Sequence, residues 1–252
     1  MHDINILKAG EKGVVVDFGN VIDPEVNGCV HRLAHSIATT MHGEVIEVIP
    51  TYRSLMVYFD PLQTNREAIS DKIRQFLHAG SEADSGGDTA TVVSIPVCYG
   101  AEFGPDLEFV AEHNGLTPQE VIDIHTSQPY QVYMLGFTPG FPYLGGMSER
   151  IAAPRLAQPR VVIPAGSVGI AGSQTGIYPI ESPGGWQLIG RTPLRVFNPG
   201  SSDPFLFAAG NYLQFTAIDA DTFQHIRQQV EAGIYTPVTS TIARGGTASC
   251  AR

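Results

Sequence analysis

Arginines gather in one part of this 252-residue chain, between Pro129 and Gly200. That stretch holds five arginines, no lysine and only two acidic residues, so its net charge is +3, although the whole chain carries −10. Arginine without lysine favours planar, bidentate recognition of a carboxylate or a phosphate. The pattern indicates anion binding, and the alternative interpretation is a chance placement of a few charges on a solvated surface.

Histidine offers one acid–base candidate. His125 lies at the end of a predicted helix just before the arginine-bearing stretch, where it can exchange a proton near neutral pH or simply cap the helix C-terminus. His31 and His35 have a metal-like spacing of four, but they lie opposite the apolar face of their helix. The three cysteines form no C-x-x-C pair, so we expect no metal site.

A glycine-rich run from Pro164 to Gly176 matches none of the nucleotide-binding or nucleophile loops. No Gly-Lys-Ser/Thr follows it, and its glycine spacing is not G-x-G-x-x-G. Ala165 stands where a nucleophile elbow around Ser167 would need glycine. The run is either a backbone that approaches a ligand closely or a set of barrel corners. Its side-chain donors are Ser167, Ser173, Gln174 and Thr175.

The same stretch is rich in glycine and proline, and aromatic residues lie among them at Phe137, Phe141, Tyr143, Tyr178 and Trp186. Core packing explains such residues in a domain of this size. A loop with three aromatics between prolines can also form a rigid pocket wall or the rim of a partner-binding surface. Composition and spacing by themselves name no reaction.

The first eighty residues alternate strand and helix patterns and predict an α+β sandwich domain over residues 1–80. Asp23 and Pro24 open a helix as N-cap and first helical residue. The segment 64–67 reads as a capping box for a second helix, with Thr64 as the N-cap. Strands are predicted at 14–18, 44–49 and 54–59. Residues 81–91 are small and polar and predict a linker.

Residues 92–235 predict a second, mostly-β domain. A strand at 92–97 is followed by two short helices, one from Pro105 to about Gly115 and one that opens with a capping box at Thr117 and closes around His125. Breakers then leave only short apolar runs, at 130–135, 161–163, 168–171, 188–189 and 194–197, which is typical of a barrel or sandwich. A helix is predicted over 219–232, and a flexible tail over 236–252.

The overall charge and hydropathy exclude several classes of protein. A chain with 25 acidic and 15 basic residues is a poor ligand for nucleic acid or an anionic membrane. No apolar run approaches the roughly 18–20 residues that cross a bilayer. The first residues lack a basic segment followed by an apolar one, so we expect no signal peptide and a cytoplasmic location.

Several long motifs in order resemble one family. They lie at residues 96–100, 104–107, 135–145, 164–168, 174–179 and 182–192. Together they resemble the family of 5-oxoprolinase B subunits, also called the KipI or allophanate hydrolase subunit 1 family. The resemblance implies an N-terminal α+β domain followed by a cyclophilin-like β-barrel, in agreement with the interpretation above.

The same resemblance implies a non-autonomous part of an enzyme. Such a chain works with a C subunit, similar to allophanate hydrolase subunit 2, and an A subunit of the LamB/YcsF type. Together they hydrolyse 5-oxo-L-proline to L-glutamate with ATP and Mg at the level of the complex, and we expect neither to bind tightly to this chain alone.

Candidate site residues come from the residue patterns described above, and the arginines gain a hypothetical role from the implied reaction. Catalytic candidates are His125, Arg155, Arg160 and Arg191, the arginines as stabilisers of new negative charge. Residues expected to bind the substrate or a partner are Phe137, Thr138, Pro139, Gly140, Phe141, Ser167, Gly172, Gln174, Thr175, Tyr178 and Trp186.

Two alternatives stay open. A KipI-type chain would bind and inhibit a sporulation-type histidine kinase, with the loop around Phe137 as a rim. A third possibility is one part of a urea carboxylase or amidolyase system, because related regions occur fused within those enzymes.

Overall fold

The computed structural model describes residues 4–79 and 89–243. The described residues form two compact units, one within the first 89 residues and one over Ala90–Ile242. We describe each unit by itself.

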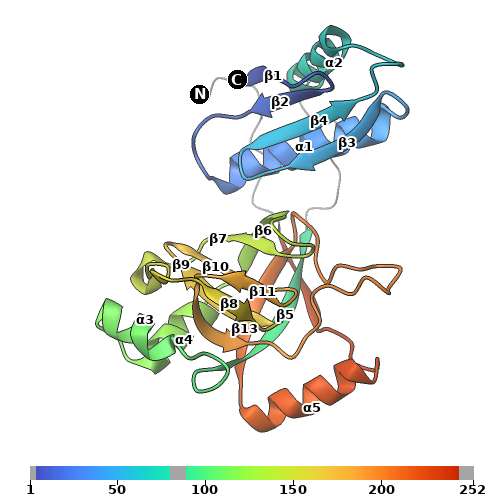
Figure 1. The fold of residues 1–252 in the computed structure, drawn as a ribbon. Helices are drawn as coiled ribbons and strands as arrows, with labels where there is room; N and C mark the ends of the chain where they lie inside the picture. The colour runs from blue at the N-terminus through green and yellow to red at the C-terminus, as the bar shows by residue number, and fades with distance from the viewer. Residues whose placement is uncertain (1–3, 80–88, 244–252) are drawn as a thin grey trace. The chain divides into compact units, whose positions relative to one another are not determined.

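The first unit is a four-stranded antiparallel sheet with two helices (Figure 1). The sheet order is β1-β2-β4-β3. Its elements are β1 (Asn5–Ala9), β2 (Gly13–Asp17), α1 (Pro24–Thr40), β3 (Val45–Pro50), β4 (Ser54–Phe59) and α2 (Arg66–Ala79). The α+β sandwich class is confirmed, and β1 is a strand whose position was not predicted from the sequence.

Alternation along the strands makes one face of this sheet apolar. Val14 and Val16 of β2 and Leu55 and Val57 of β4 are fully buried, and both helices place their apolar faces in the same core. The predicted start of α1 is confirmed, because the Asp23 carboxylate accepts from two backbone N–H groups of the first turn.

The predicted capping box of α2 is wrong. The helix begins one residue later, and Asn65 is the N-cap, its side chain accepting from the Ala68 N–H at 3.0 Å. Thr64, the predicted cap, directs its side chain to the Glu44 carboxylate instead. A tertiary partner for Thr64 therefore decides between two adjacent capping residues.

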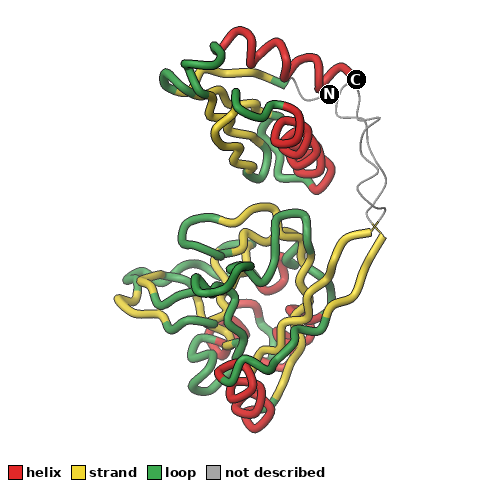
Figure 2. Tube along the Cα trace, turned by 90° about the vertical axis from the view of Figure 1, so that its right-hand side faces the viewer, coloured by secondary structure: helices red, strands yellow, loops and turns green. Residues whose placement is uncertain are grey.

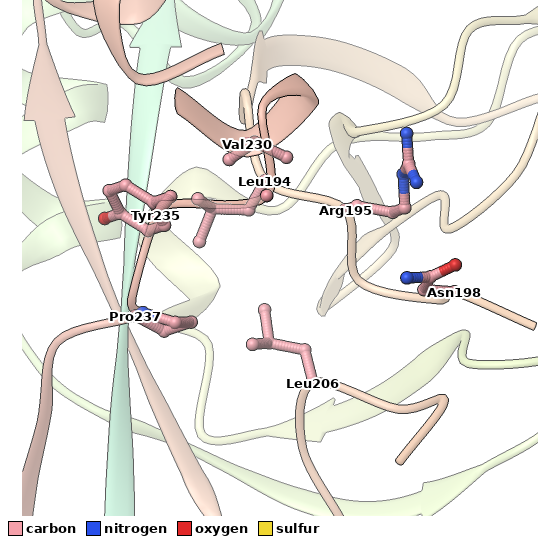
Figure 3. Close-up of a pocket in the computed structure, with 8 residues that line it drawn as sticks. Leu194, Arg195, Asn198, Leu206, Val230, Tyr235 and Pro237 are labelled. Carbon is pink, nitrogen blue, oxygen red and sulfur yellow. The ribbon is translucent and has the colours of Figure 1, made fainter. Parts of the chain in front are cut away.

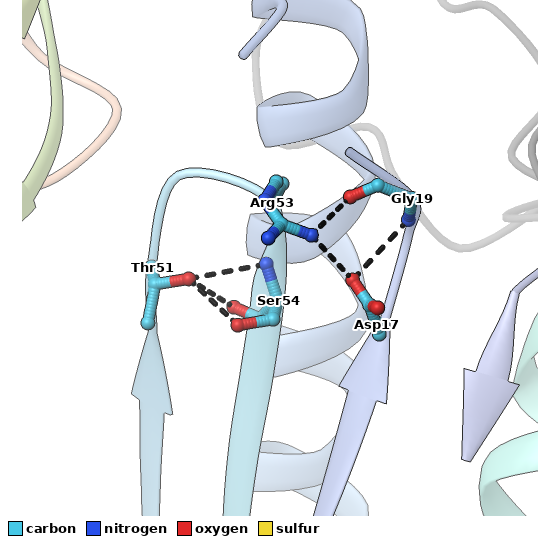
Figure 4. A network of polar contacts seen from close by, with 5 residues as sticks. All are labelled: Asp17, Gly19, Thr51, Arg53 and Ser54. Carbon is cyan, nitrogen blue, oxygen red and sulfur yellow. Dashed lines mark hydrogen bonds and ion pairs between the residues drawn. The ribbon is translucent and has the colours of Figure 1, made fainter. Parts of the chain in front are cut away.

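A polar network fixes the turn between β3 and β4 next to the end of β2 (Figure 4). Arg53 pairs with Asp17 at 2.9 Å and donates a second bond to the Gly19 carbonyl. Across the turn, the Thr51 and Ser54 hydroxyls lie 2.8 Å apart. These contacts hold the segment that leads from β2 into α1.

The second unit is a mixed sheet that curls into a nearly closed barrel (Figure 1). The main path is β10-β9-β12-β5-β13-β6-β7, and its end strands β10 and β7 lie side by side. β13 runs parallel to β5 and the other pairings along the path are antiparallel. A two-stranded ribbon, β11-β8, accompanies it. The mostly-β, barrel-like class is confirmed.

The elements of the second unit follow in chain order. They are β5 (Thr89–Tyr99), α3 (Leu107–Asn114), α4 (Pro118–Thr126), β6 (Tyr130–Leu135), β7 (Pro142–Gly145), the 3₁₀ helix η1 (Glu149–Ile151), β8 (Arg160–Ile163), β9 (Ser167–Ala171), β10 (Gln174–Ile177), β11 (Ser182–Gly184), β12 (Gln187–Arg191), β13 (Tyr212–Ile218), α5 (Ala220–Glu231) and β14 (Thr239–Ala243). The capping box at Thr117 is confirmed, and Gly115 ends α3 in the left-handed conformation.

Three segment predictions need correction. Residues 194–197 form no strand; Leu194 and Val196 are buried in the core, but the pairing found there is an isolated bridge at Phe197. β5 begins at Thr89, so it takes up the end of the predicted linker, whose remainder lies outside the described residues. The predicted flexible tail contains β14, which pairs with β5 (Figure 2), and residues 244–252 lie outside the described part.

No helix within residues 4–79 and 89–243 is long and apolar enough to cross a membrane.

Candidate functional site

Four predicted binding residues meet in one aromatic cluster in the second unit. Phe141 lies at its centre, and its ring centroid is 5.4–5.7 Å from those of the other members. The ring planes cross at 65–89°, the edge-to-face arrangement that aromatic quadrupoles favour. We call Phe137, Phe141, Tyr143, Tyr178 and Trp186 the aromatic cluster.

The loop that carries Phe137 presents this ring to solvent. Phe137 is 69% exposed and has a φ of 63°, which is unusual for a residue other than glycine. The Thr138 hydroxyl is buried without a hydrogen-bond partner. Gly140 also has a positive φ, and a Cβ there would lie 3.0 Å from Phe197. The loop therefore holds one aromatic side chain outward on a tightly packed base.

Arg160 is committed to an ion pair. Its guanidinium contacts the Asp106 carboxylate at 2.7 Å and the Trp186 carbonyl at 3.3 Å. The other oxygen of Asp106 accepts from the Leu188 N–H at 2.6 Å. This half-buried pair joins the start of α3 to β8 and β12, so Arg160 has a structural role in the unit. Asp106 was not predicted as a site residue, because its partner lies 54 positions away in the chain.

Arg155 and Arg191 are differently placed. Arg155 is exposed. Burial raises the pKa of Tyr178 in the aromatic cluster, and the positive charges of Arg155 and Arg160 partly counteract this rise. Among the residues that the structure describes, Arg191 donates through Nε alone, to the Ala165 carbonyl at 3.0 Å. Burial, and then repulsion by Arg227 of α5, lower the pKa of Arg191. Both arginines keep terminal nitrogens for an anion.

His125 is fully buried and hydrogen-bonded through both ring nitrogens. Thr175 donates to the Gly169 carbonyl, so its oxygen accepts from Nε2 of His125 at 2.8 Å. Nδ1 is then the acceptor for the Tyr99 hydroxyl, also at 2.8 Å. Burial lowers the pKa of His125 to about 3, and its ring stacks on Phe215. The imidazole is neutral and bridges Tyr99 and Thr175 inside the core.

The glycine-rich run forms the β9-β10 hairpin and its entry. Gly172 has a φ of 59° in the two-residue turn, and its backbone pairs with Ala153. Ser167 and Thr175 are buried in the strands. Of the two interpretations, the structure therefore supports barrel corners, and the predicted binding residues Ser167, Gly172, Gln174 and Thr175 lie along this hairpin.

A small cavity of about 150 Å³ opens elsewhere in the second unit (Figure 3). Eight residues line it: Leu194, Arg195, Asn198, Leu206, Val230, Gly233, Tyr235 and Pro237. None of them was predicted as a site residue. They come from two separate parts of the chain, residues 194–206 and 230–237, which meet at the cavity.

The described residues form no dedicated metal-ligand cluster. No three His, Cys, Asp or Glu side chains within residues 4–79 and 89–243 come together so as to hold a metal ion. The glycine-rich run forms a hairpin. We assign no step to ATP on this chain.

Comparisons with known proteins agree on one family. Residues 4–207 match the carboxyltransferase domain, subdomain C and D. Over 238 residues the chain is 45% identical to the B subunit of 5-oxoprolinase from Bacillus subtilis, covering 89% of this chain and 97% of that protein. A conserved uncharacterized protein from Pyrococcus horikoshii is 47% identical, with a TM-score of 0.52 over 87% of this chain and 100% of that chain.

A solved urea amidolyase from K. lactis shares the fold alone. It is 19% identical, with a TM-score of 0.75 over 95% of this chain and 16% of that chain. The family model and the high identity over nearly the whole length of the Bacillus protein carry the assignment. This chain belongs to the family of 5-oxoprolinase B subunits.

Proposed function

We propose that this chain is the B subunit of an ATP-dependent 5-oxoprolinase, which hydrolyses 5-oxo-L-proline to L-glutamate. The observation that carries the proposal is the 45% identity to a 5-oxoprolinase B subunit over 97% of that protein. Its site geometry agrees with a protein that is inactive alone. His125 is enclosed in the core and Arg160 is ion-paired, so neither is available to a substrate.

A B subunit is part of a multi-subunit complex, so we expect this chain to act together with partner proteins. We propose a C subunit similar to allophanate hydrolase subunit 2 and an A subunit of the LamB/YcsF type as the partners. ATP and Mg belong to the assembled complex, and the need for ATP makes the cytoplasm the expected compartment. The exposed ring of Phe137 gives the aromatic cluster a surface that can contact one of these partners.

Two arginines are the proposed charge stabilisers. Opening the lactam ring by water adds negative charge at the former amide carbonyl, and a guanidinium positioned there lowers the energy of that charge. Arg155 and Arg191 have terminal nitrogens free of other described partners, whereas those of Arg160 contact Asp106 and Trp186. Arg160→Ala should therefore impair folding of this chain before it impairs chemistry.

The test is ATP-dependent glutamate release from 5-oxo-L-proline by the reconstituted complex. It is measured with this chain alone, with this chain and the A and C subunits, and with those two partners in its absence. Activity only in the full mixture supports the proposal. Arg155→Ala and Arg191→Ala should then lower turnover without preventing assembly, and exposed Arg150→Ala is the matched control.

Absence of activity in a properly assembled complex would overturn the proposal. Binding of a histidine kinase by this chain would then favour the inhibitor alternative. Biotin-dependent carboxyl transfer together with other domains would favour the urea carboxylase alternative.

A further inference from the structure

We propose that the cavity of the second unit binds a small carboxylate that carries no free ammonium group. This inference rests on the proposed function in one respect, the identity of the ligand: under that function it is 5-oxo-L-proline. The proposal commits to the cavity lined by the eight residues given above (Figure 3).

The size of the cavity sets the size of the ligand. An apolar cavity of about 150 Å³ holds a benzene-sized molecule, and this cavity has the same volume. It is smaller than the roughly 300–1,000 Å³ pockets of drug-sized ligands. A single five- or six-membered ring fits, with a substituent reaching the opening.

The two sides of the cavity differ in chemistry. Arg195 and Asn198 lie on one side in Figure 3, and the apolar side chains lie on the other. Leu194 belongs to the main core of the unit, and Leu206, Val230 and Tyr235 pack against it. A ligand with one anionic group and a compact apolar body matches this division.

The polar side has unused donors. Arg195 is an exposed residue. Within the described part of the chain its guanidinium has neither an ion pair nor a hydrogen-bond partner, so it can receive a carboxylate in a bidentate contact. Oδ1 of Asn198 accepts from the Gly200 N–H at 3.3 Å. The amide nitrogen points toward the apolar side in Figure 3, where it can donate to a carbonyl oxygen.

The charge of the lining selects against amino acids. It contains one cation and no Asp or Glu. A free α-amino acid would bring an ammonium that no lining carboxylate can pair and that the Arg195 guanidinium would repel. In 5-oxo-L-proline the nitrogen is part of a neutral lactam, and the lactam oxygen is an acceptor for the Asn198 amide.

The walls are held in place by the backbone of the unit itself. In the 194–206 segment, the Asn198 N–H donates to the Pro204 carbonyl at 2.8 Å, and the Leu206 N–H donates to the Val196 carbonyl at 3.1 Å. The Tyr235 N–H bonds back to the Gln229 carbonyl at the end of α5. Such a pre-organised wall reduces the entropy lost on binding.

Arg191 connects the cavity to the proposed chemistry. Its pKa is affected by Arg227, which lies about one helical turn before Val230 on α5. Val230 lines the cavity. The arginine proposed to stabilise charge and the cavity proposed to hold the substrate are thus both associated with helix α5.

The test is calorimetric titration of the full chain with three probes. 5-oxo-L-proline and cyclopentanecarboxylate should bind, the first more tightly because of its lactam oxygen, and L-proline should bind at least about tenfold more weakly. Arg195→Gln should weaken the binding of 5-oxo-L-proline at least about tenfold, and the exposed Arg150→Gln should leave it unchanged. Leu206→Phe, which fills the cavity, should abolish binding while thermal unfolding stays cooperative.

The inference is overturned if L-proline binds as tightly as 5-oxo-L-proline, or if Arg195→Gln binds like the wild type. The reconstituted complex separates this failure from that of the proposed function. If the complex containing Arg195→Gln turns over with an unchanged KM, the proposed ligand site is refuted and the proposed function stands. If the chain binds 5-oxo-L-proline in an Arg195-dependent way but the complete complex shows no turnover, the proposed function is refuted and the ligand site stands.

Discussion

Replacement of His125 by phenylalanine tests whether this residue is a neutral structural bridge. Phenylalanine keeps the ring that stacks on Phe215 at 4.4 Å between centroids, but it removes both hydrogen bonds. The Tyr99 hydroxyl then loses its acceptor, and the Thr175 oxygen loses a donor while it still bonds to Gly169. Each buried polar group left unpaired costs about 1–3 kcal/mol. The variant should therefore be about 2–4 kcal/mol less stable at neutral pH.

The pH dependence gives a sharper test than the loss of stability itself. The pKa of His125 falls from 6.5 to about 3 on folding. Above pH 6.5 neither state binds the proton, and the stability is fully present. As the pH falls below 6.5, only the unfolded state takes up the proton, so the free energy of unfolding decreases by up to about 1.4 kcal/mol per pH unit. At pH 5 the wild type should have lost about 2 kcal/mol through this residue.

The assay is urea unfolding of the wild type and His125→Phe at pH 7.5 and pH 5, followed by tryptophan fluorescence. Trp186 is the single tryptophan and is buried in the second unit, so the signal reports on the unit that contains His125. The stability gap between the two proteins should shrink by about 2 kcal/mol at the lower pH. His113→Phe, at an exposed position of α3, is the control. An equal gap at both pH values would refute the buried, neutral imidazole.

Three further predictions concern the frame of the second unit. Asp106→Ala should destabilise the unit by about 2–3 kcal/mol in the same assay, because it leaves a half-buried guanidinium and a backbone N–H unpaired. Glu231→Ala, which breaks an exposed ion pair on α5, is the control and should change the stability little. Equal effects of the two substitutions would contradict the structural role of Asp106. Gly184→Ala should lower the midpoint of thermal unfolding, since a Cβ there would overlap the Tyr178 hydroxyl. An unchanged midpoint would contradict the tight packing of Gly184 against the aromatic cluster. Burial raises the pKa of the Cys98 thiol, so its peptide should stay unlabelled by a thiol reagent at pH 8 until urea is added, as read by mass spectrometry; rapid native labelling would contradict its burial.

Local chemistry made much of the fold predictable. The caps at Asp23 and Thr117 were identified because a side-chain oxygen next to the first helical turn satisfies free N–H groups whatever the rest of the chain does. The same holds for the apolar faces of α1 and α5, whose spacing of three and four residues follows from the helix itself. The errors arose where a distant partner decided, as at Thr64, which bonds Glu44 instead of capping α2.

Strands were less predictable than helices because the backbone hydrogen bonds of a strand are made with a neighbouring strand and not within the segment itself. The apolar run at 194–197 supplies core side chains but finds no continuous partner, whereas the polar segment of β14 pairs with β5. Neither outcome is encoded within the segment. The hydropathy of a run indicates burial, and pairing depends on which edge of the sheet lies beside it.

The order of the motifs was enough to predict the family by resemblance. Composition and patterning predicted an α+β first part and a barrel-like second unit. Which of the chemically capable residues are available became known only from their packing in three dimensions. Folding buries His125 between Tyr99 and Thr175 and pairs Arg160 with Asp106. It leaves Arg195 without a described partner beside a cavity whose other side is apolar. Charge and hydrogen bonding depend on neighbours in space, and the partner of Arg160 is 54 positions away in the chain.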